Sequence, residues 1–297
     1  MIKKLFQNFS AAFVANLINL CVTVFVTLYI PRFSGVEVYS QWQLYLFYIA
    51  YLWIIVLGWP DGIYLFCGGK AYTDIEKSKI KTQFFVMTVY LAVVLPILLI
   101  ASSGMPNALV MAFVLLDTAV EVPREALIKL LQATNRTAAS SVVIIVSRLL
   151  FFIAVERCVA WGTVSFRFMA LADIATKAAG LLLAGLICKD IITAPIQHVW
   201  HNVFRELGGT LFSGSKIMLG NLCAMFIVGI VRLAIQNQWG LIAFGKISLT
   251  LSISNLFNIF ISALALTLFP VLKTLRQKDL ARSYRFIEDI LVITLFG

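Results

Sequence analysis

Long apolar runs, separated by short polar segments, dominate the pattern along the chain. A transmembrane helix needs about 20 consecutive, mostly apolar residues, and eight runs reach roughly that length. They lie at 9–30, 42–66, 82–101, 108–131, 139–155, 163–187, 210–235 and 242–271. The runs do not alternate between apolar and polar positions, as the roughly 10-residue strands of a membrane barrel do. The pattern therefore predicts an all-α, polytopic transmembrane helical bundle.

A ninth apolar run begins near Tyr284 and continues to Gly297. Its roughly 14 residues would extend about 21 Å as a helix, which is less than the roughly 30 Å of a bilayer's hydrocarbon core. The expected fold thus has eight complete spans and a partial ninth. We expect residues 1–297 on their own not to transport, because alternating access requires two lobes that rock around a shared site.

An amphipathic segment separates the first six predicted spans from the rest. Between 189 and 207, apolar residues recur at the three- and four-residue spacing of a helix on the membrane surface. We therefore predict a first lobe at 1–188, an interfacial linker helix at 189–207 and an incomplete second lobe at 208–297. His198 and His201 lie one turn apart on the polar face, but no carboxylate or thiolate completes a metal site. We expect neither a metal nor a cofactor.

Composition and charge place the chain in a membrane with its N-terminus in the cytoplasm. Hydrophobic residues make up 61% of the sequence, against roughly 45–50% in a soluble domain. Lys and Arg concentrate in cytoplasmic loops, and only Arg32 and Arg157 fall outside in this orientation. The predicted cytoplasmic cations are Lys3, Lys4, Lys70, Lys77, Lys79, Lys81, Lys129, Arg136, Lys189, Arg205, Lys273, Arg276, Lys278, Arg282 and Arg285. The net charge of +10 thus reflects topology, and nucleic-acid binding need not be invoked.

Seven cations lie inside the apolar runs: Arg124, Arg148, Arg167, Lys177, Lys216, Arg232 and Lys246. A cation at the bilayer centre costs roughly 2.5–3.5 kcal/mol even on the lenient insertion scale, so such residues usually face a protein interior or a watery cavity. The sequence therefore predicts a positively lined chamber that receives an anion. Arg148, Arg167 and Arg232 have no acidic neighbour one turn away and are the leading anion-binding candidates. Arg124, Lys177 and Lys246 complete the predicted substrate-binding set.

The fourth predicted span carries the densest polar chemistry. Asp117, Glu121 and Arg124 are spaced by four and three residues and project from one helical face, with Pro123 among them. One interpretation is that Glu121 and Arg124 neutralise each other and the kink is architectural. The other is that Asp117 or Glu121 carries protons, because one carboxylate stays unpaired within this span. In the sixth span, we interpret Asp173 and its neighbour one turn on, Lys177, as a structural i, i+4 pair.

Several segments resemble one family of membrane transporters, the Wzx-like flippases of polysaccharide biosynthesis, whose superfamily also contains the multidrug and toxic-compound extruders. The most distinctive segments run from Arg232 through Gln238-Trp239-Gly240 to Ala243-Phe244-Gly245-Lys246-Ile247-Ser248-Leu249, then Leu251-Ser252-Ile253-Ser254-Asn255-Leu256 and Phe269-Pro270-Val271-Leu272. Weaker likenesses are Leu131-Gln132-Ala133-Thr134-Asn135-Arg136, Ser147-Arg148 and Ile30-Pro31-Arg32-Phe33. The chain lacks roughly the last third of that family's bundle.

This resemblance implies a fold, a location and an activity. Such flippases have 12 to 14 helices in two lobes around a central cavity, and they lie in the bacterial plasma (inner) membrane. They move undecaprenyl-diphosphate-linked oligosaccharides for O-antigen, capsule or exopolysaccharide synthesis to the outer leaflet by alternating access. The expected ligands and partners are thus a lipid-linked oligosaccharide, membrane lipids, a polysaccharide polymerase and a chain-length regulator. Arg pairs with phosphate through two parallel hydrogen bonds, so Arg148, Arg167 and Arg232 suit a diphosphate.

Two other classes remain open, and a third is disfavoured. An extruder of drugs or cations would share the fold, but its cavity is expected to be acidic or apolar. A non-transporting, truncated remnant is the second alternative. A membrane glycosyltransferase or polymerase would carry catalytic carboxylates or metal ligands on a substantial loop. The outer loops here are short and poor in Asp, Glu and His, so we expect no enzyme.

Overall fold

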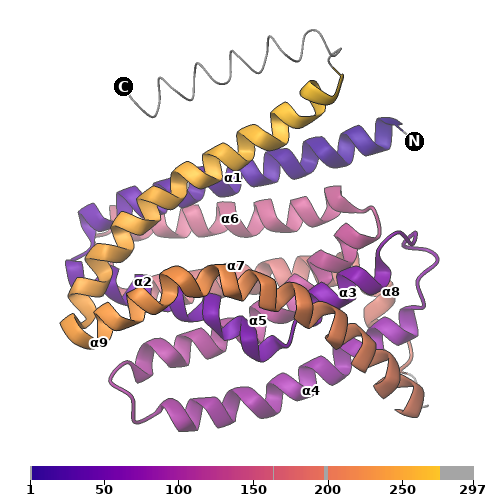
Figure 1. The fold of residues 1–297 in the computed structure, drawn as a ribbon, viewed down its shortest axis with the longest axis horizontal. Helices are drawn as coiled ribbons and strands as arrows, with labels where there is room; N and C mark the ends of the chain where they lie inside the picture. The colour runs from indigo at the N-terminus through magenta and orange to yellow at the C-terminus, as the bar shows by residue number, and fades with distance from the viewer. Residues whose placement is uncertain (1, 163, 197–199, 275–297) are drawn as a thin grey trace. The chain divides into compact units, whose positions relative to one another are not determined.

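The computed structural model describes residues 2–162, 164–196 and 200–274, and every regular element among them is a helix. The chain divides into two units, Met1–Ile253 and Ser254–Gly297, and the fold and site below belong to the first. In chain order the helices are α1 (Ile2–Phe33), α2 (Val36–Leu52), the short 3₁₀ helix η1 (Trp53–Val56), α3 (Trp59–Cys67), α4 (Lys77–Ser102), α5 (Ala108–Ala133), α6 (Thr137–Ala160), α7 (Phe166–Ile187), α8 (Lys189–Ile192) and α9 (Trp200–Thr274). Figure 1 shows the long helices of the first unit side by side, which confirms an all-helical bundle.

The outer surface of the bundle is strongly apolar. On α4 and α7, Val93, Ile97, Ile100, Leu182 and Leu186 are all exposed, and Ile100 and Leu186 leave 75% and 72% of their area uncovered. Soluble monomers rarely expose apolar patches of this kind over whole helices. Within the described residues, five helices are long and apolar enough to cross a bilayer, and a bent pair raises the number to six. These features identify a membrane-embedded helical bundle.

The second predicted span, 42–66, is not one straight helix. Leu57 and Gly58 have φ of 56° and 71°, in the left-handed region, and α3 then starts with Pro60 in its first turn. The two parts meet at 59°. Gly58 also lies against the backbone of Gly214 in α9, so a Cβ there would overlap that helix. A left-handed backbone and a close helix contact both favour glycine, and they explain why the span bends at this point.

Helix α5 is the centre of the first unit. It packs against α2, α3, α4, α6 and α7, and its buried residues include Val114, Asp117, Val122, Arg124 and Leu131. It matches the predicted span 108–131 in position, and it continues through Pro123 without a break. Its charged residues keep it from qualifying as a membrane span by hydropathy. These charges are tolerated because α5 lies at the centre of the unit, where neighbouring helices rather than lipid surround them.

Helix α9 contains a reversal that the helix boundaries alone do not reveal. Gly240 has φ 79° and ψ −177°, which is not helical, and Figure 1 shows the helix doubling back near its label. The Arg232 guanidinium donates to Ser248 Oγ at 2.7 Å, although 16 residues of straight helix would separate them by about 24 Å. Residues 200–239 and 241–253 therefore form a helical hairpin. The reversal agrees with the predicted gap between 235 and 242.

The prediction of eight complete spans goes further than the structure supports. The described helices give five candidate spans, or six with the bent pair, and one of the five is Met225–Asn255, which contains the reversal at Gly240. The two-lobed arrangement involves residues on both sides of Ile253 and stays a prediction. The predicted linker 189–207 includes α8 and the start of α9, whereas His198 and the partial ninth span lie outside the described residues.

Candidate functional site

The best-defined polar site is an ion cluster between α5, α7 and α2. Lys177 Nζ lies 2.7 Å from Asp117 Oδ1 and 2.7 Å from Asp173 Oδ2, and the Tyr45 hydroxyl donates to Asp173 Oδ2 at 3.1 Å. We call Asp117, Asp173 and Lys177 the Lys177 triad. Asp117 and Tyr45 are completely buried. The predicted pair of Asp173 and Lys177 is confirmed, but the second carboxylate on the same ammonium comes from another helix.

A second ion pair lies one turn further along α5. Arg124 donates from Nε and Nη2 to the two oxygens of Glu121, both at 2.7 Å, which confirms the predicted pairing of these residues. Gly180 of α7 lies close to Arg124 and to Ser147 of α6, and a Cβ on Gly180 would overlap the Ser147 hydroxyl. The glycine thus allows α7 to pack close to this ion pair. Two parallel hydrogen bonds occupy much of the guanidinium, so Arg124 is poorly placed to bind a further anion.

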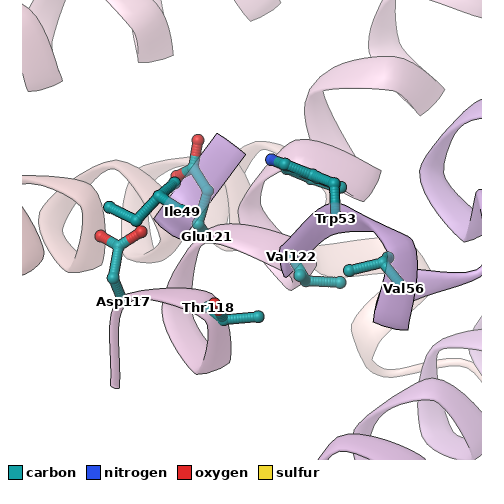
Figure 2. Close-up of a pocket in the computed structure, with 7 residues that line it drawn as sticks. All are labelled: Ile49, Trp53, Val56, Asp117, Thr118, Glu121 and Val122. Carbon is teal, nitrogen blue, oxygen red and sulfur yellow. The ribbon is translucent and has the colours of Figure 1, made fainter. Parts of the chain in front are cut away.

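A small cavity lies between the two ion pairs and α2. Its volume is about 10 Å³, and Asp117, Thr118 and Glu121 line it together with Ile49 and Trp53. Figure 2 shows the carboxyl groups of Asp117 and Glu121 projecting to the same side of α5, next to Ile49. The Oδ2 atom of Asp117 has no hydrogen-bond partner among the described residues. A cavity of this size accommodates about one water molecule.

The charge of the Lys177 triad defines what it can do chemically. Two carboxylates share one ammonium, so the fully ionised triad carries a net charge of −1. An uncompensated buried charge is costly, and one proton or one further cation would remove it. The sequence leaves either Asp117 or Glu121 as the predicted proton carrier. In the structure Arg124 pairs with Glu121 alone, whereas Asp117 shares Lys177 with Asp173.

A larger cleft lies beside α5 on the side of the α2–α3 bend and α9. It has a volume of about 240 Å³, and its polar lining includes Asp61, Glu125, Lys129 and Asn221. The apolar lining consists of Ala50, Trp53, Gly58, Pro60, Met218, Leu222 and Met225. Lys129 pairs with Asp61 at 3.2 Å, whereas Glu125 makes no ion pair or hydrogen bond with any described residue. We refer to this site as the Glu125 cleft.

Arg232 occupies a third polar site, inside the α9 hairpin. Its guanidinium donates to Ser248 and lies 5.2 Å and 5.1 Å from the ring centroids of Phe47 and Phe244. No carboxylate pairs with it among the described residues. Arg232 is thus a half-buried cation held by a hydroxyl and two aromatic faces.

Among the described residues, no hydrogen bond links the other predicted anion-binding cations to Arg232, whose guanidinium donates to Ser248. Arg148 is half-buried on α6, Arg167 is exposed at the start of α7 and Lys246 is exposed on the second arm of the hairpin. Arg124 and Lys177 are engaged in ion pairs. Around α5 the structure places five buried or half-buried carboxylates, Asp61, Asp117, Glu121, Glu125 and Asp173, and three such cations, Arg124, Lys129 and Lys177. The shared cationic chamber therefore stays a prediction.

Tyr45, Asp61 and Glu125 were not among the residues predicted from the sequence, and Lys129 was predicted only as a cytoplasmic cation. A signal existed for Asp61, because an acidic residue within an apolar run is costly and usually functional or paired. Glu125 follows Arg124 directly, and its orientation toward α9 depends on packing that no periodicity reveals. Among the residues described here, no three His, Cys, Asp or Glu side chains could hold a metal ion. No family model, curated protein or solved structure matches the chain.

Proposed function

We propose that the protein is a membrane flippase that moves an undecaprenyl-diphosphate-linked oligosaccharide between leaflets. Arg232 carries the proposal, because it is a half-buried guanidinium without a carboxylate partner among the described residues. Opposite charges attract far more strongly at low dielectric than in water, and a guanidinium matches phosphate through two parallel hydrogen bonds. Its position inside a helical hairpin would let substrate binding and hairpin movement influence each other.

The Lys177 triad supports a coupling role in the same proposal. The ionised triad carries a net charge of −1. Uptake of one proton would neutralise it, and release of the proton would restore the charge at the centre of the bundle. Asp117 is the proposed acceptor, because it lines the small cavity and its buried Oδ2 has no hydrogen bond from the described residues. Replacement of Asp117 by Asn should therefore reduce the pH dependence of transport, whereas Glu121→Gln should leave that dependence largely unchanged.

The test is a flipping assay in proteoliposomes that contain the lipid-linked oligosaccharide, with a membrane-impermeant lectin to detect sugar at the outer face. Because residues 1–297 on their own are expected not to transport, the variants are made in the protein as the cell expresses it, and residues 1–297 are assayed beside it. Arg232→Gln should abolish protein-dependent flipping, and Arg232→Lys should retain part of it, because charge survives without the planar fork. Lys216→Gln is the matched control, because Lys216 is an exposed cation on α9. Flipping by Arg232→Gln at the wild-type rate would refute the role of Arg232.

A cation extruder of the same superfamily is the second candidate. The observation that favours it is the excess of carboxylates over cations among the buried and half-buried residues around α5, described above. Efflux of a cationic dye from the same proteoliposomes would test it. Dye efflux without oligosaccharide flipping would favour extrusion, and flipping without dye efflux would favour the flippase.

A further inference from the structure

We propose that the Glu125 cleft binds the ammonium group of a small organic cation. This site is separate from Arg232, and the inference does not depend on the proposed flippase activity. Its starting point is the contrast between the two carboxylates of the cleft. Asp61 pairs with Lys129 at 3.2 Å. Glu125 is half-buried and makes no hydrogen bond or ion pair with the described residues, and the nearby cations Arg124 and Lys129 act on it only through their charge.

The charge balance of the cleft favours a cation over an anion. Asp61 and Glu125 contribute −2 and Lys129 contributes +1, so the ionised site carries −1. The Lys129 ammonium also lies 5.6 Å from the centroid of the Tyr64 ring, so Tyr64 and Asp61 both act to hold it. A ligand that brings one positive charge to Glu125 would leave the site neutral, and a buried charge is stable only when it is paired.

The rest of the lining favours an organic cation over a bare metal ion. Trp53, Met218, Leu222 and Met225 provide mostly apolar walls, and Ca²⁺ or Mg²⁺ would need several oxygen ligands at about 2.0–2.6 Å. Ligand sites are typically apolar clefts with a few polar groups that fix orientation. The volume of about 240 Å³ suits a compact molecule. The amide of Asn221, which also lines the cleft, provides a hydrogen-bonding group that would orient a polar substituent of the ligand.

The fold also explains why this site exists. The left-handed residues Leu57 and Gly58 bend the α2–α3 span, and Gly58 allows the backbone of α9 to approach at Gly214. The bend and the contact place Trp53, Pro60 and Asp61 across from Glu125 of α5 and Met225 of α9. A straight span would not present these residues to a common space.

The experiment is equilibrium dialysis of the purified protein in dodecyl maltoside with radiolabelled benzyltrimethylammonium, corrected for binding to empty micelles. Unlabelled benzyl alcohol and benzoate serve as neutral and anionic competitors. We expect saturable binding of the cation that neither competitor displaces. Glu125→Gln should weaken binding at least tenfold, and Glu156→Gln, which changes an exposed carboxylate on α6, should leave it unchanged.

A second variant keeps the proposal testable if Glu125→Gln fails to fold. Asn221→Phe fills the cleft without a change in charge and should abolish binding while the melting temperature stays close to that of the wild type. Absence of saturable binding to the wild-type protein would overturn the proposal. Equal displacement by benzyl alcohol, or unchanged affinity in a folded Glu125→Gln or Asn221→Phe variant, would also overturn it.

Discussion

At the level of single residues, the buried charges of this protein are held by partners on other helices as well as on their own. Lys177 shows this most clearly, because it pairs with Asp173 one turn away and with Asp117 across the α5–α7 interface. Removal of one member of a buried ion pair is far more damaging than removal of the whole pair, since it leaves an uncompensated charge. The triad is therefore a sensitive point for stability.

Replacement of Lys177 by Met should destabilise the protein by about 3–5 kcal/mol, because two buried carboxylates lose their ammonium. Thermal unfolding in detergent would show this as a large drop in melting temperature. Lys246→Met removes an exposed cation and is the control. Addition of Asp117→Asn and Asp173→Asn to Lys177→Met should restore part of the lost stability. Equal melting temperatures of the Lys177 and Lys246 variants would contradict the ion cluster.

Glycines of α9 provide a second test at this scale. The Tyr51 hydroxyl donates to Met225 O at 2.6 Å, and a Cβ on Gly229 would overlap that hydroxyl. Gly229→Ala should therefore lower the melting temperature, while Gly220→Ala, which meets nothing within 4 Å, should leave it unchanged or raise it slightly, since Ala favours helix by about 1 kcal/mol. Tyr51→Phe should relieve part of the clash. A harmless Gly229→Ala would show that α2 and α9 do not pack in this way.

At the level of elements, the apolar runs predicted the helices closely. The runs at 82–101, 108–131 and 139–155 became α4, α5 and α6, each extended by a few residues. Hydrophobic periodicity depends on sequence neighbours, so it locates helices and pairs such as Glu121 with Arg124. It carries no information about residues 60 positions apart, and Asp117 with Lys177 could not be predicted from it. The bend at Leu57 and Gly58 was likewise missed, because an apolar run does not reveal a left-handed backbone.

One contact between elements should respond to pH. Asp190 of α8 accepts a hydrogen bond from the Tyr72 hydroxyl at 2.7 Å and pairs with Lys77 of α4 at 2.6 Å. Burial acts to raise the pKa of Asp190, but the bonds from Lys77 and Tyr72 outweigh it and hold that pKa below its ordinary value. Burial and the bond to Asp190 also raise the pKa of Tyr72. Asp190 is thus ionised at neutral pH, and its contact with Lys77 anchors α8 to α4.

Because the folded-state pKa of Asp190 is depressed, its contribution is complete above the unfolded-state pKa and is lost as pH falls through the folded-state pKa. We expect the protection of the amide hydrogens in 188–196, measured relative to their intrinsic exchange rates, to decrease over that acidic range. Both side chains of the ion pair are partly exposed, so the effect should not exceed about 1 kcal/mol. Asp190→Asn should remove the pH dependence, whereas Asp74→Asn, an exposed carboxylate nearby, should not. Identical profiles for wild type and Asp190→Asn would refute the assignment.

At the level of the whole molecule, the basic loops of the first unit meet at one end of the bundle. Lys77 pairs with Asp190, the Ser78 hydroxyl donates to Pro195 O at 2.8 Å, and the Arg136 guanidinium lies 4.4 Å from the centroid of the Tyr72 ring. The α3–α4 loop, the α5–α6 loop and the segment after α7 therefore lie together. Because basic loops remain in the cytoplasm, this end should face inward.

Cysteine labelling in intact cells tests that orientation. In a background without the native cysteines, Thr73→Cys should react with a membrane-impermeant maleimide only after permeabilisation, while Gly104→Cys, in the open α4–α5 loop, should react in intact cells. Cysteines at Gly35 and Gln238 should behave like Gly104→Cys, because α1 and the first arm of the α9 hairpin end there. The predicted cytoplasmic site at Lys278 lies outside the described residues. Reaction of Thr73→Cys in intact cells, with Gly104→Cys protected, would show the opposite topology. The uneven distribution of Lys and Arg would then not explain the orientation of the protein.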